Sequence, residues 1–481
     1  MVTFIISIVL LVVGYFTYGK VVDRIFKPDE RATPAVCRQD GVDYVPMGNK
    51  RIFLIQLLNI AGLGPIVGAI QGALWGPVVY IWIVAGSILA GGVHDYMVGM
   101  ISMRNGGGSI TEITGKYLGN GVKQVMRVFS VGLLLLLATV FAVGSVSSLS
   151  MITPSSLNFT FWFVVVIIYF FMATFLPIDK IIGKLYPFFG VCLIIMAVGV
   201  AVMLVAGGYS LPEMQLVNMH PDGLPIWPFM LITVACGALS GFHATQSPLM
   251  ARCLTTEKKG RQVFYGSMIT EGVIALVWAA AGVAFYETTG GLQEVLNNPD
   301  IGPNGAVYQI CMTLLGPVGG ILAMIGVIAC PISSGDTALR SARLILAEWF
   351  GLEQKNMGKR LLITIPILAF TVIVGTLFNY AVVWRYFAWC NQTLASIALW
   401  AISVYLWRHN KPYWIAALPA VFMSAVCVTY FFAAPECLNM RAAGLMNVAS
   451  LIGLAGAAAL LFMFLKSTVL SKKTRGPEAY R

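Results

Sequence analysis

The chain has 481 residues, of which 58% are hydrophobic and 11% are charged, and its mean hydropathy is +0.83. Soluble domains carry about twice this charged fraction, so the composition excludes a soluble globular fold. The net charge of +11 does not indicate nucleic-acid binding, because the basic residues lie between the apolar runs, where they set membrane topology. Nine cysteines occur singly, which is typical of buried inert thiols, although a disulfide between Cys311 and Cys437 stays open.

The apolar runs have the length of helices that cross a bilayer, about 20 residues each. The first run lacks the basic start and the cleavage site of a signal peptide, so we expect a retained span. Three prolines interrupt residues 287–317, which we expect to form an outer loop with short helices. The thirteen predicted spans cover residues 2–19, 52–73, 76–101, 124–150, 159–177, 181–206, 226–249, 263–286, 318–347, 361–379, 383–407, 412–433 and 443–465.

The positions of the basic residues predict the orientation of these spans. If the N-terminus is outside and the spans alternate, 29 of the 31 Lys and Arg residues fall on one side of the membrane. Only Arg385 and Arg441 fall on the other side. Because cytoplasmic loops carry an excess of Lys and Arg, this asymmetry predicts an outer N-terminus and a cytoplasmic C-terminus.

Two of the spans are interrupted by glycine and proline. The second span contains N-I-A-G-L-G-P (59–65), and the seventh contains C-G-A-L-S-G-F-H-A-T-Q-S-P (236–248). Such residues weaken the backbone hydrogen-bond ladder of a helix and leave N–H and C=O groups that need partners inside the membrane. Close helix packing through small residues is the structural alternative.

The two breaks are five spans apart and therefore opposite in orientation, a pattern that marks the substrate site of inverted-repeat transporters. The predicted organisation is a first span and loop (1–50), a first repeat (51–206), an inverted second repeat (224–407), and two further spans with a tail (408–481). The predicted substrate-binding residues are Asn59, Gly62, Gly64, Gly237, Gly241, His243 and Gln246.

Ionisable residues inside predicted spans are costly and therefore candidates for ion or proton coupling. His94 and Asp95 form either an ion pair at the inner end of a span or a proton-relay pair, since histidine titrates near physiological pH. His243, on the second break, is either a packed residue or a contact to substrate or proton. Glu271 is equally consistent with a structural salt bridge and with coupling.

The ninth span carries polar residues near its middle, after Pro331. The hydroxyls and the carboxylate supply oxygen ligands for Na⁺ or a protonatable site, although Asp336 and Arg340, four residues apart, form a structural pair in the alternative interpretation. The predicted coupling residues here are Ser333, Ser334, Asp336 and Thr337. No nucleotide, metal or nucleophile motif is present, so we predict no catalytic residue, no resident metal and no cofactor.

Several of these segments resemble the carbon starvation protein A family. The similar segments are G-P-I-V-G-A-I-Q-G-A (64–73), A-G-G-V-H-D-Y (90–96), G-A-L-S-G-F-H-A-T-Q-S-P-L-M-A-R (237–252) and S-G-D-T-A (334–338). The resemblance implies a cytoplasmic (inner) membrane carrier of the amino acid–polyamine–organocation superfamily. The expected fold is an all-α integral membrane protein with about 13 transmembrane helices and a five-plus-five inverted-repeat core of the leucine-transporter type.

The predicted function is secondary active import of short peptides or a small carboxylate such as pyruvate, by proton or cation symport, under nutrient limitation. The expected partners are this small organic substrate, a coupling proton or Na⁺, and the lipid bilayer, with no nucleic acid. A sodium-coupled amino acid transporter is the alternative on the same fold. A channel or an intramembrane enzyme is the alternative of another class, and accumulation of unchanged solute against a gradient separates both from a carrier.

Overall fold

The structure, a computed structural model, describes residues 1–41, 43–174, 182–353 and 356–470. The predicted end of the fifth span, the start of the sixth and the tail beyond residue 470 lie outside these residues. Most of the described residues are helical, and two segments pair as one isolated β-bridge between Met47 and Leu254. The α-helices are α1 (Val2–Phe16), α2 (Tyr18–Phe26), α3 (Pro34–Cys37), α4 (Asn49–Ile60), α5 (Ala69–Gly72), α6 (Val79–Ala85), α7 (Gly92–Arg104), α8 (Ile110–Leu118), α9 (Asn120–Ile152), α10 (Phe159–Ala173), α11 (Ile182–Ala206), α12 (Leu231–Thr233), α13 (Gly241–Ala251), α14 (Gly266–Phe285), α15 (Thr289–Asn297), α16 (Gly302–Phe350), α17 (Met357–Leu377), α18 (Tyr380–Arg408), α19 (Trp414–Ala433) and α20 (Met446–Ser467).

Ten helical stretches of the described residues are long and apolar enough to cross a membrane, or eleven if one bent pair is counted as a span. Each coincides with a predicted span, and the bent pair is the second span, Asn49–Ile60 with Gly64–Trp75. The remaining two of the thirteen predicted spans are α10, which has 15 described residues, and the seventh span, which is broken into short pieces. The number of spans in the structure is therefore lower than the thirteen predicted because one predicted span is short and another is broken.

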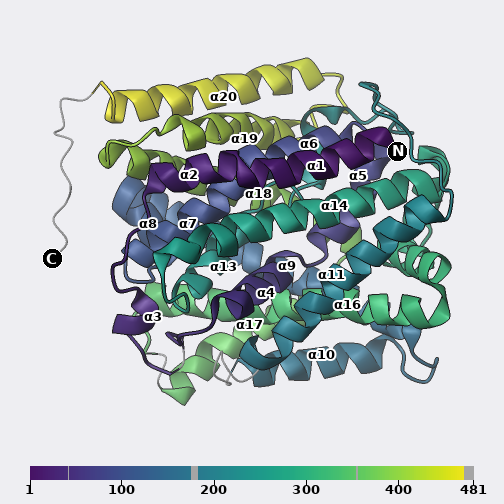
Figure 1. Cartoon of the computed structure of the whole chain (residues 1–481), viewed down its shortest axis with the longest axis horizontal. Coiled ribbons are helices and arrows are strands. Elements are labelled where there is room, and N and C mark those ends of the chain that lie inside the picture. Colours follow the sequence, from purple (N-terminus) through teal and green to yellow (C-terminus); the bar gives the residue numbers. More distant parts are fainter. Residues whose placement is uncertain (42, 175–181, 354–355, 471–481) are drawn as a thin grey trace.

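The helices lie side by side with their axes nearly aligned (Figure 1). In that view α19 and α20 lie along one edge of the bundle, and α10 lies along the opposite edge. The N-terminus lies at one end of the bundle and α3 and α8 lie at the other (Figure 1). At the first of these ends, the N-terminal ammonium group donates to the carboxylate of Glu213 over 2.6 Å, and this hydrogen bond lowers the pKa of Glu213 to about 2. The N-terminus is therefore bonded to the segment that follows α11.

The predicted outer loop at 287–317 contains helical turns, as expected. It holds α15 and the first part of α16, which is kinked at Gly316. Gly316 has a φ of 68°, a conformation that is strained for side chains other than glycine, so the long helix changes direction here before it enters the bundle. Cys311 and Cys437 are both free thiols in the structure, so the possible disulfide is not formed.

Both predicted breaks interrupt their helices. In the first, α4 ends at Ile60, residues 61–63 are not helical, and the chain resumes as a π-helical turn, η1 (Gly64–Gly68), with a bend of 55°. In the second, α12 ends at Thr233, and α13 begins only at Gly241. Because these unwound segments are buried, their backbone polar groups need partners from neighbouring helices or from a ligand.

Candidate functional site

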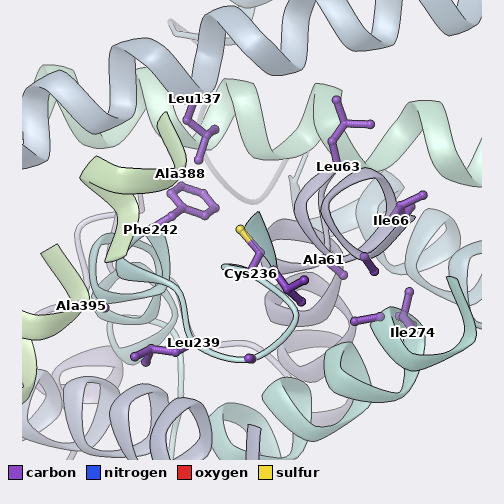
Figure 2. Packing of buried hydrophobic residues seen from close by; sticks show 14 of the residues in the cluster. Ala61, Leu63, Ile66, Leu137, Cys236, Leu239, Phe242, Ile274, Ala388 and Ala395 are labelled. Atoms are coloured by element: carbon purple, nitrogen blue, oxygen red, sulfur yellow. The ribbon is translucent and has the colours of Figure 1, made fainter. Parts of the chain in front are cut away.

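The two unwound segments face each other at the centre of the bundle. Figure 2 shows Cys236 of the second break between Phe242 on one side and the ribbon that carries Ala61 and Leu63 on the other. The approach is close, because a Cβ atom added to Gly64 would lie 2.3 Å from both Cβ and Sγ of Cys236. In this structure the space beside Gly64 is therefore filled by the other break and not by an open substrate cavity.

The other glycines predicted to bind substrate also lie against protein atoms. A Cβ atom added to Gly62 would lie 2.4 Å from the Phe141 ring, and one added to Gly237 would lie 2.5 Å from the Cβ of Ala275. At Gly241 the nearest atom, at 2.2 Å, is the backbone oxygen of Asn391 in α18. These glycines thus permit close approach of helices, which was the structural alternative for the breaks.

Side chains of two neighbouring elements satisfy the backbone of the second break. Gln392 of α18 donates to the carbonyl of Leu239 over 2.9 Å. From the other side, the Trp82 indole donates to the carbonyl of Val234 over 3.0 Å, and the Ser87 hydroxyl donates to that of Gly237 over 3.0 Å. The unwound segment is therefore a defined structure, held between α18 and the α6–α7 span.

A chain of four ionisable side chains, all fully buried, runs beside this break. Asp95 of α7 lies between two histidines: its Oδ1 is 2.8 Å from Nδ1 of His94, and its Oδ2 is 2.7 Å from Nδ1 of His243 in α13. The Nε2 atom of His243 lies 3.4 Å from Oε2 of Glu271 in α14. We call these four residues the buried relay. The sequence predicted each of them separately, and the structure brings them together.

The geometry of the buried relay fixes where most of its hydrogens lie. An ionised carboxylate only accepts hydrogen bonds, so both histidines must present Nδ1–H to Asp95 and, when neutral, keep a lone pair on Nε2. The lone pair of His243 can accept the proton of a neutral Glu271. Moving that proton to Nε2 produces an imidazolium between two carboxylates. One proton can therefore occupy either Glu271 or His243, with Asp95 as the fixed counter-charge.

Both ends of the buried relay are open toward other groups. Nε2 of both histidines and both carboxylate oxygens of Glu271 have no hydrogen-bond partner among the described residues, so the 3.4 Å approach of His243 to Glu271 is an ion-pair contact and not a hydrogen bond. Buried ionisable groups are normally fully paired, and an unpaired one is costly. Glu271 also lies one turn before Ala275, which contacts Gly237. The open carboxyl end of the relay thus lies next to the second break.

The predicted coupling residues of the ninth span divide between two faces of α16. The hydroxyl of Ser334 donates to the carbonyl of Asn59 over 2.6 Å, and the hydroxyl of Thr337 is 3.4 Å from Oδ1 of the same residue. Ser333 bonds within its own helix to the carbonyl of Cys330. The hydroxyls of Ser334 and Thr337, but not that of Ser333, therefore contact Asn59 at the edge of the first break.

The carboxylate of Asp336 instead points toward α11. It accepts a hydrogen bond from the hydroxyl of Tyr186 over 2.9 Å, and that hydroxyl is 3.2 Å from the hydroxyl of Tyr169 in α10. Arg340, one turn further, donates to the carbonyl of Ala173 over 3.1 Å. The single oxygen cluster expected from the sequence is thus two separate groups, because Asp336, two positions after Ser334, points to a different side of the helix from Ser334.

At the end of the bundle near α8, acidic side chains accept hydrogen bonds from side chains of neighbouring segments. Glu257 is bound by Arg104 through hydrogen bonds of 3.0 and 2.9 Å, and Glu348 at the end of α16 accepts from Arg127 over 2.8 Å and from Ser109 over 3.0 Å. Beside Glu348 a cavity of about 170 Å³ opens between α8, α13 and α16. Arg104 is therefore bonded to Glu257 and not to the His94–Asp95 pair.

Some residues at the site were not identified from the sequence. Asn391 and Gln392 stand as two adjacent amides in the middle of an apolar span, a signal that was available. Tyr186 carried no such signal, since tyrosine is common in apolar runs. Of the predicted substrate residues, Gln246 is fully buried, and neither of its amide atoms has a partner among the described residues.

Comparisons with known proteins agree with this architecture. The chain matches the family described as carbon starvation protein CstA over residues 1–158 and 151–289. A membrane protein of Haemophilus influenzae is 41% identical, over 62% of this chain and 94% of that one. The peptide transporter CstA of Helicobacter pylori is 25% identical, over 86% and 79%. The pyruvate/proton symporter BtsT of Escherichia coli is 28% identical, over 66% and 52%.

Among solved structures, that of MhsT in complex with L-phenylalanine matches with a TM-score of 0.57 and 15% identity, over 86% of this chain and 99% of that chain. At this identity the match shows the fold alone, which is that of the leucine-transporter type. The family match over residues 1–158 and 151–289, more than half of the sequence, establishes the relationship: the chain belongs to the carbon starvation protein CstA family.

Proposed function

We propose that the chain is a proton-coupled importer of a small solute that carries a carboxylate, either a short peptide or pyruvate. The observation that carries this proposal is the buried relay, whose geometry would let one proton lie on either Glu271 or His243 beside the second break. The names of the relatives, a peptide transporter and a pyruvate/proton symporter, support the same substrate class.

The proposed cycle couples the proton to the breaks. When Glu271 is neutral, its one proton is available to the lone pair on Nε2 of His243, and no net charge is added beside the unwound backbone. When the proton leaves, two carboxylates lie in the low-dielectric centre with only one titratable imidazole between them, an arrangement that costs several kcal/mol. Protonation thus favours the packed arrangement of α13 and α14 seen here, and deprotonation favours its opening. The substrate carboxylate is attracted by the N-terminal end of the α13 half-helix.

The remaining parts of the proposal concern organisation and location. Residues 51–206 and 224–407 are proposed as the two inverted repeats, because each begins with a span that is broken in mid-membrane. The membrane is proposed to be the cytoplasmic (inner) membrane. The N-terminal end of the bundle faces outward, and the end with α3 and α8 faces the cytoplasm, in accord with the distribution of Lys and Arg.

The orientation gives a direct prediction. Cys37 is exposed at the end of the bundle near α3, so a membrane-impermeant maleimide should label it only after the cells are permeabilised. A cysteine that replaces Leu216, a highly exposed residue at the opposite end, should be labelled in intact cells. Mass spectrometry of the labelled peptides distinguishes the two sites. Labelling of Cys37 in intact cells would contradict the proposed orientation.

Uptake by proteoliposomes tests the function itself. Purified protein in vesicles with an inward pH gradient should accumulate labelled pyruvate or dialanine above the outside concentration, and a protonophore should abolish this accumulation. Accumulation that follows a Na⁺ gradient instead would favour the sodium-coupled alternative, for which the contact of Ser334 with the carbonyl of Asn59 supplies oxygen ligands. Downhill equilibration without accumulation would contradict symport.

Asp336 gives a separate prediction. Because its carboxylate faces Tyr186 and not the buried relay, we expect Asp336→Asn to keep proton-driven accumulation within about twofold of the unchanged protein. The Tyr186 hydroxyl retains an acceptor, but the negative charge beside Arg340 is lost, which should lower the free energy of unfolding by about 1–3 kcal/mol. Thermal denaturation and vesicle uptake measure the two effects. Loss of accumulation with intact exchange would instead place Asp336 in the coupling mechanism.

A further inference from the structure

The side chain of Asn391 spans the whole second break. It lies in the middle of α18 and is fully buried. Its amide oxygen accepts from the backbone N–H of Phe242 over 2.8 Å and lies 3.2 Å from the hydroxyl of Ser240. Its amide nitrogen lies 3.1 Å from the same hydroxyl and 3.4 Å from Sγ of Cys236. One amide from a neighbouring helix thus occupies the N-terminal end of α13.

The N-terminal end of the half-helix α13 attracts a carboxyl-like oxygen. The first N–H groups of a helix have no partner within the helix, and they favour an acceptor, above all a negative one. Ser240, which precedes α13, makes no side-chain cap bond to it. The carbonyl of Asn391 supplies this acceptor from outside, in the position that an oxygen of a bound carboxylate would take.

Unpaired amides nearby show that the polar groups of this region are not all satisfied in the packed arrangement. Gln246, on the same half-helix, is fully buried, and both of its amide atoms are unpaired among the described residues. The amide nitrogen of Asn59, at the edge of the first break, is also buried and unpaired there. Buried amides are normally hydrogen-bonded, so these three atoms of Gln246 and Asn59 have bonding capacity left for a polar ligand.

We propose that Asn391 holds the place of the substrate carboxylate at the N-terminal end of α13, and that the substrate displaces it on binding. This inference rests on the proposed function and deepens it, because it restricts the substrate to solutes with a free carboxylate. A neutral amide bound to a neutral N–H gives way to a carboxylate because charge-assisted hydrogen bonds are stronger. The exchange keeps the N–H of Phe242 bonded in both states.

The variant Asn391→Asp distinguishes two roles for Asn391: occupying the carboxylate site until substrate binds, or simply capping α13. A purely structural role predicts lower stability, because Asn391→Asp loses the amide donor to Ser240 and Cys236 and buries a charge, but it predicts little change in the KM of the folded protein. In the proposed role, its charge binds the N–H of Phe242 permanently and repels the incoming carboxylate. We therefore expect the KM for pyruvate or dialanine to rise at least tenfold. Asn391→Ala removes the competitor, and the KM should fall below that of the unchanged protein.

The controls use the same change elsewhere and a substrate without the charge. Asn379→Asp makes the same substitution at the exposed cap of the same helix, where the side chain accepts from the N–H of Ala381, and should leave the KM unchanged. Dialanine amide should compete poorly with dialanine in the unchanged protein, and Asn391→Asp should not weaken this competition further.

The outcomes are separable. An unchanged KM in Asn391→Asp, an equal effect on dialanine and its amide, or failure of this variant to fold would each overturn the placeholder role, since a carboxylate is required to fit there. If the unchanged protein does not transport pyruvate or dialanine at all, the proposed function fails first, whatever the variants do.

Discussion

Glu271→Gln is expected to abolish proton-driven accumulation while leaving exchange of substrate across the membrane intact. Glutamine keeps the shape of the side chain and can still donate to Nε2 of His243, but it cannot release or accept the transferred proton. For dialanine, a zwitterion without net charge, one symported proton carries one charge and contributes about 2.3 kcal/mol per 100 mV of membrane potential, which corresponds to a roughly fortyfold accumulation ratio. Vesicle uptake of dialanine under an imposed potential should therefore fall from about fortyfold to no accumulation.

The matched control is Glu294→Gln, which changes an exposed carboxylate of α15 outside the buried relay. It should accumulate substrate like the unchanged protein. Counterflow of labelled substrate, measured with equal pH on both sides, should continue in Glu271→Gln. Full accumulation by this variant would remove Glu271 from coupling, and loss of counterflow as well would indicate a structural defect instead.

Much of the fold was predictable because membrane helices leave strong signals. The apolar runs and the placement of Lys and Arg depend on local composition, so spans could be assigned without knowledge of tertiary contacts. The breaks were visible for the same reason, since glycine and proline inside an apolar run weaken a helix wherever the chain folds. The seventh span was predicted to be interrupted, and residues 234–240 lie outside its helices, where side chains of neighbouring elements bond to the carbonyls of Leu239 and Gly237.

The site itself was predictable only as a set of separate residues. Asp95 and His243 are 148 positions apart in the chain, and their contact depends on the packing of α7 against α13, which residue types alone do not determine. The division of the ninth span was within reach, because residues two positions apart on a helix do not face the same side, which separates Asp336 from Ser334. Assigning all four to one ion site overlooked that geometry.

The second large effect on transport is expected from a substitution at the contact between the two breaks. Gly64→Ala should abolish uptake, because the added carbon would lie 2.3 Å from Cβ and Sγ of Cys236, well inside van der Waals contact. Forced shifts of this kind in a packed core cost about 1–3 kcal/mol, and here the shift separates the two unwound segments that the proposed site requires to be close. Initial uptake rates in vesicles should fall by more than about tenfold.

The reciprocal change tests whether this one contact is responsible. In Gly64→Ala combined with Cys236→Gly, the nearest remaining atom of residue 236 is its Cα at 3.7 Å, an ordinary contact, so uptake should recover. The control is Gly132→Ala in the middle of α9, where no atom lies within 4 Å of the added carbon. This variant should transport normally, which would show that replacing a glycine by alanine does not by itself impair transport. Recovery in the double variant requires that the two breaks touch during transport, since removal of a thiol elsewhere would not restore space at Gly64. If the double variant stays inactive while Cys236→Gly alone is active, Gly64 is needed for its own backbone freedom, and the packing of the breaks against each other does not explain its role.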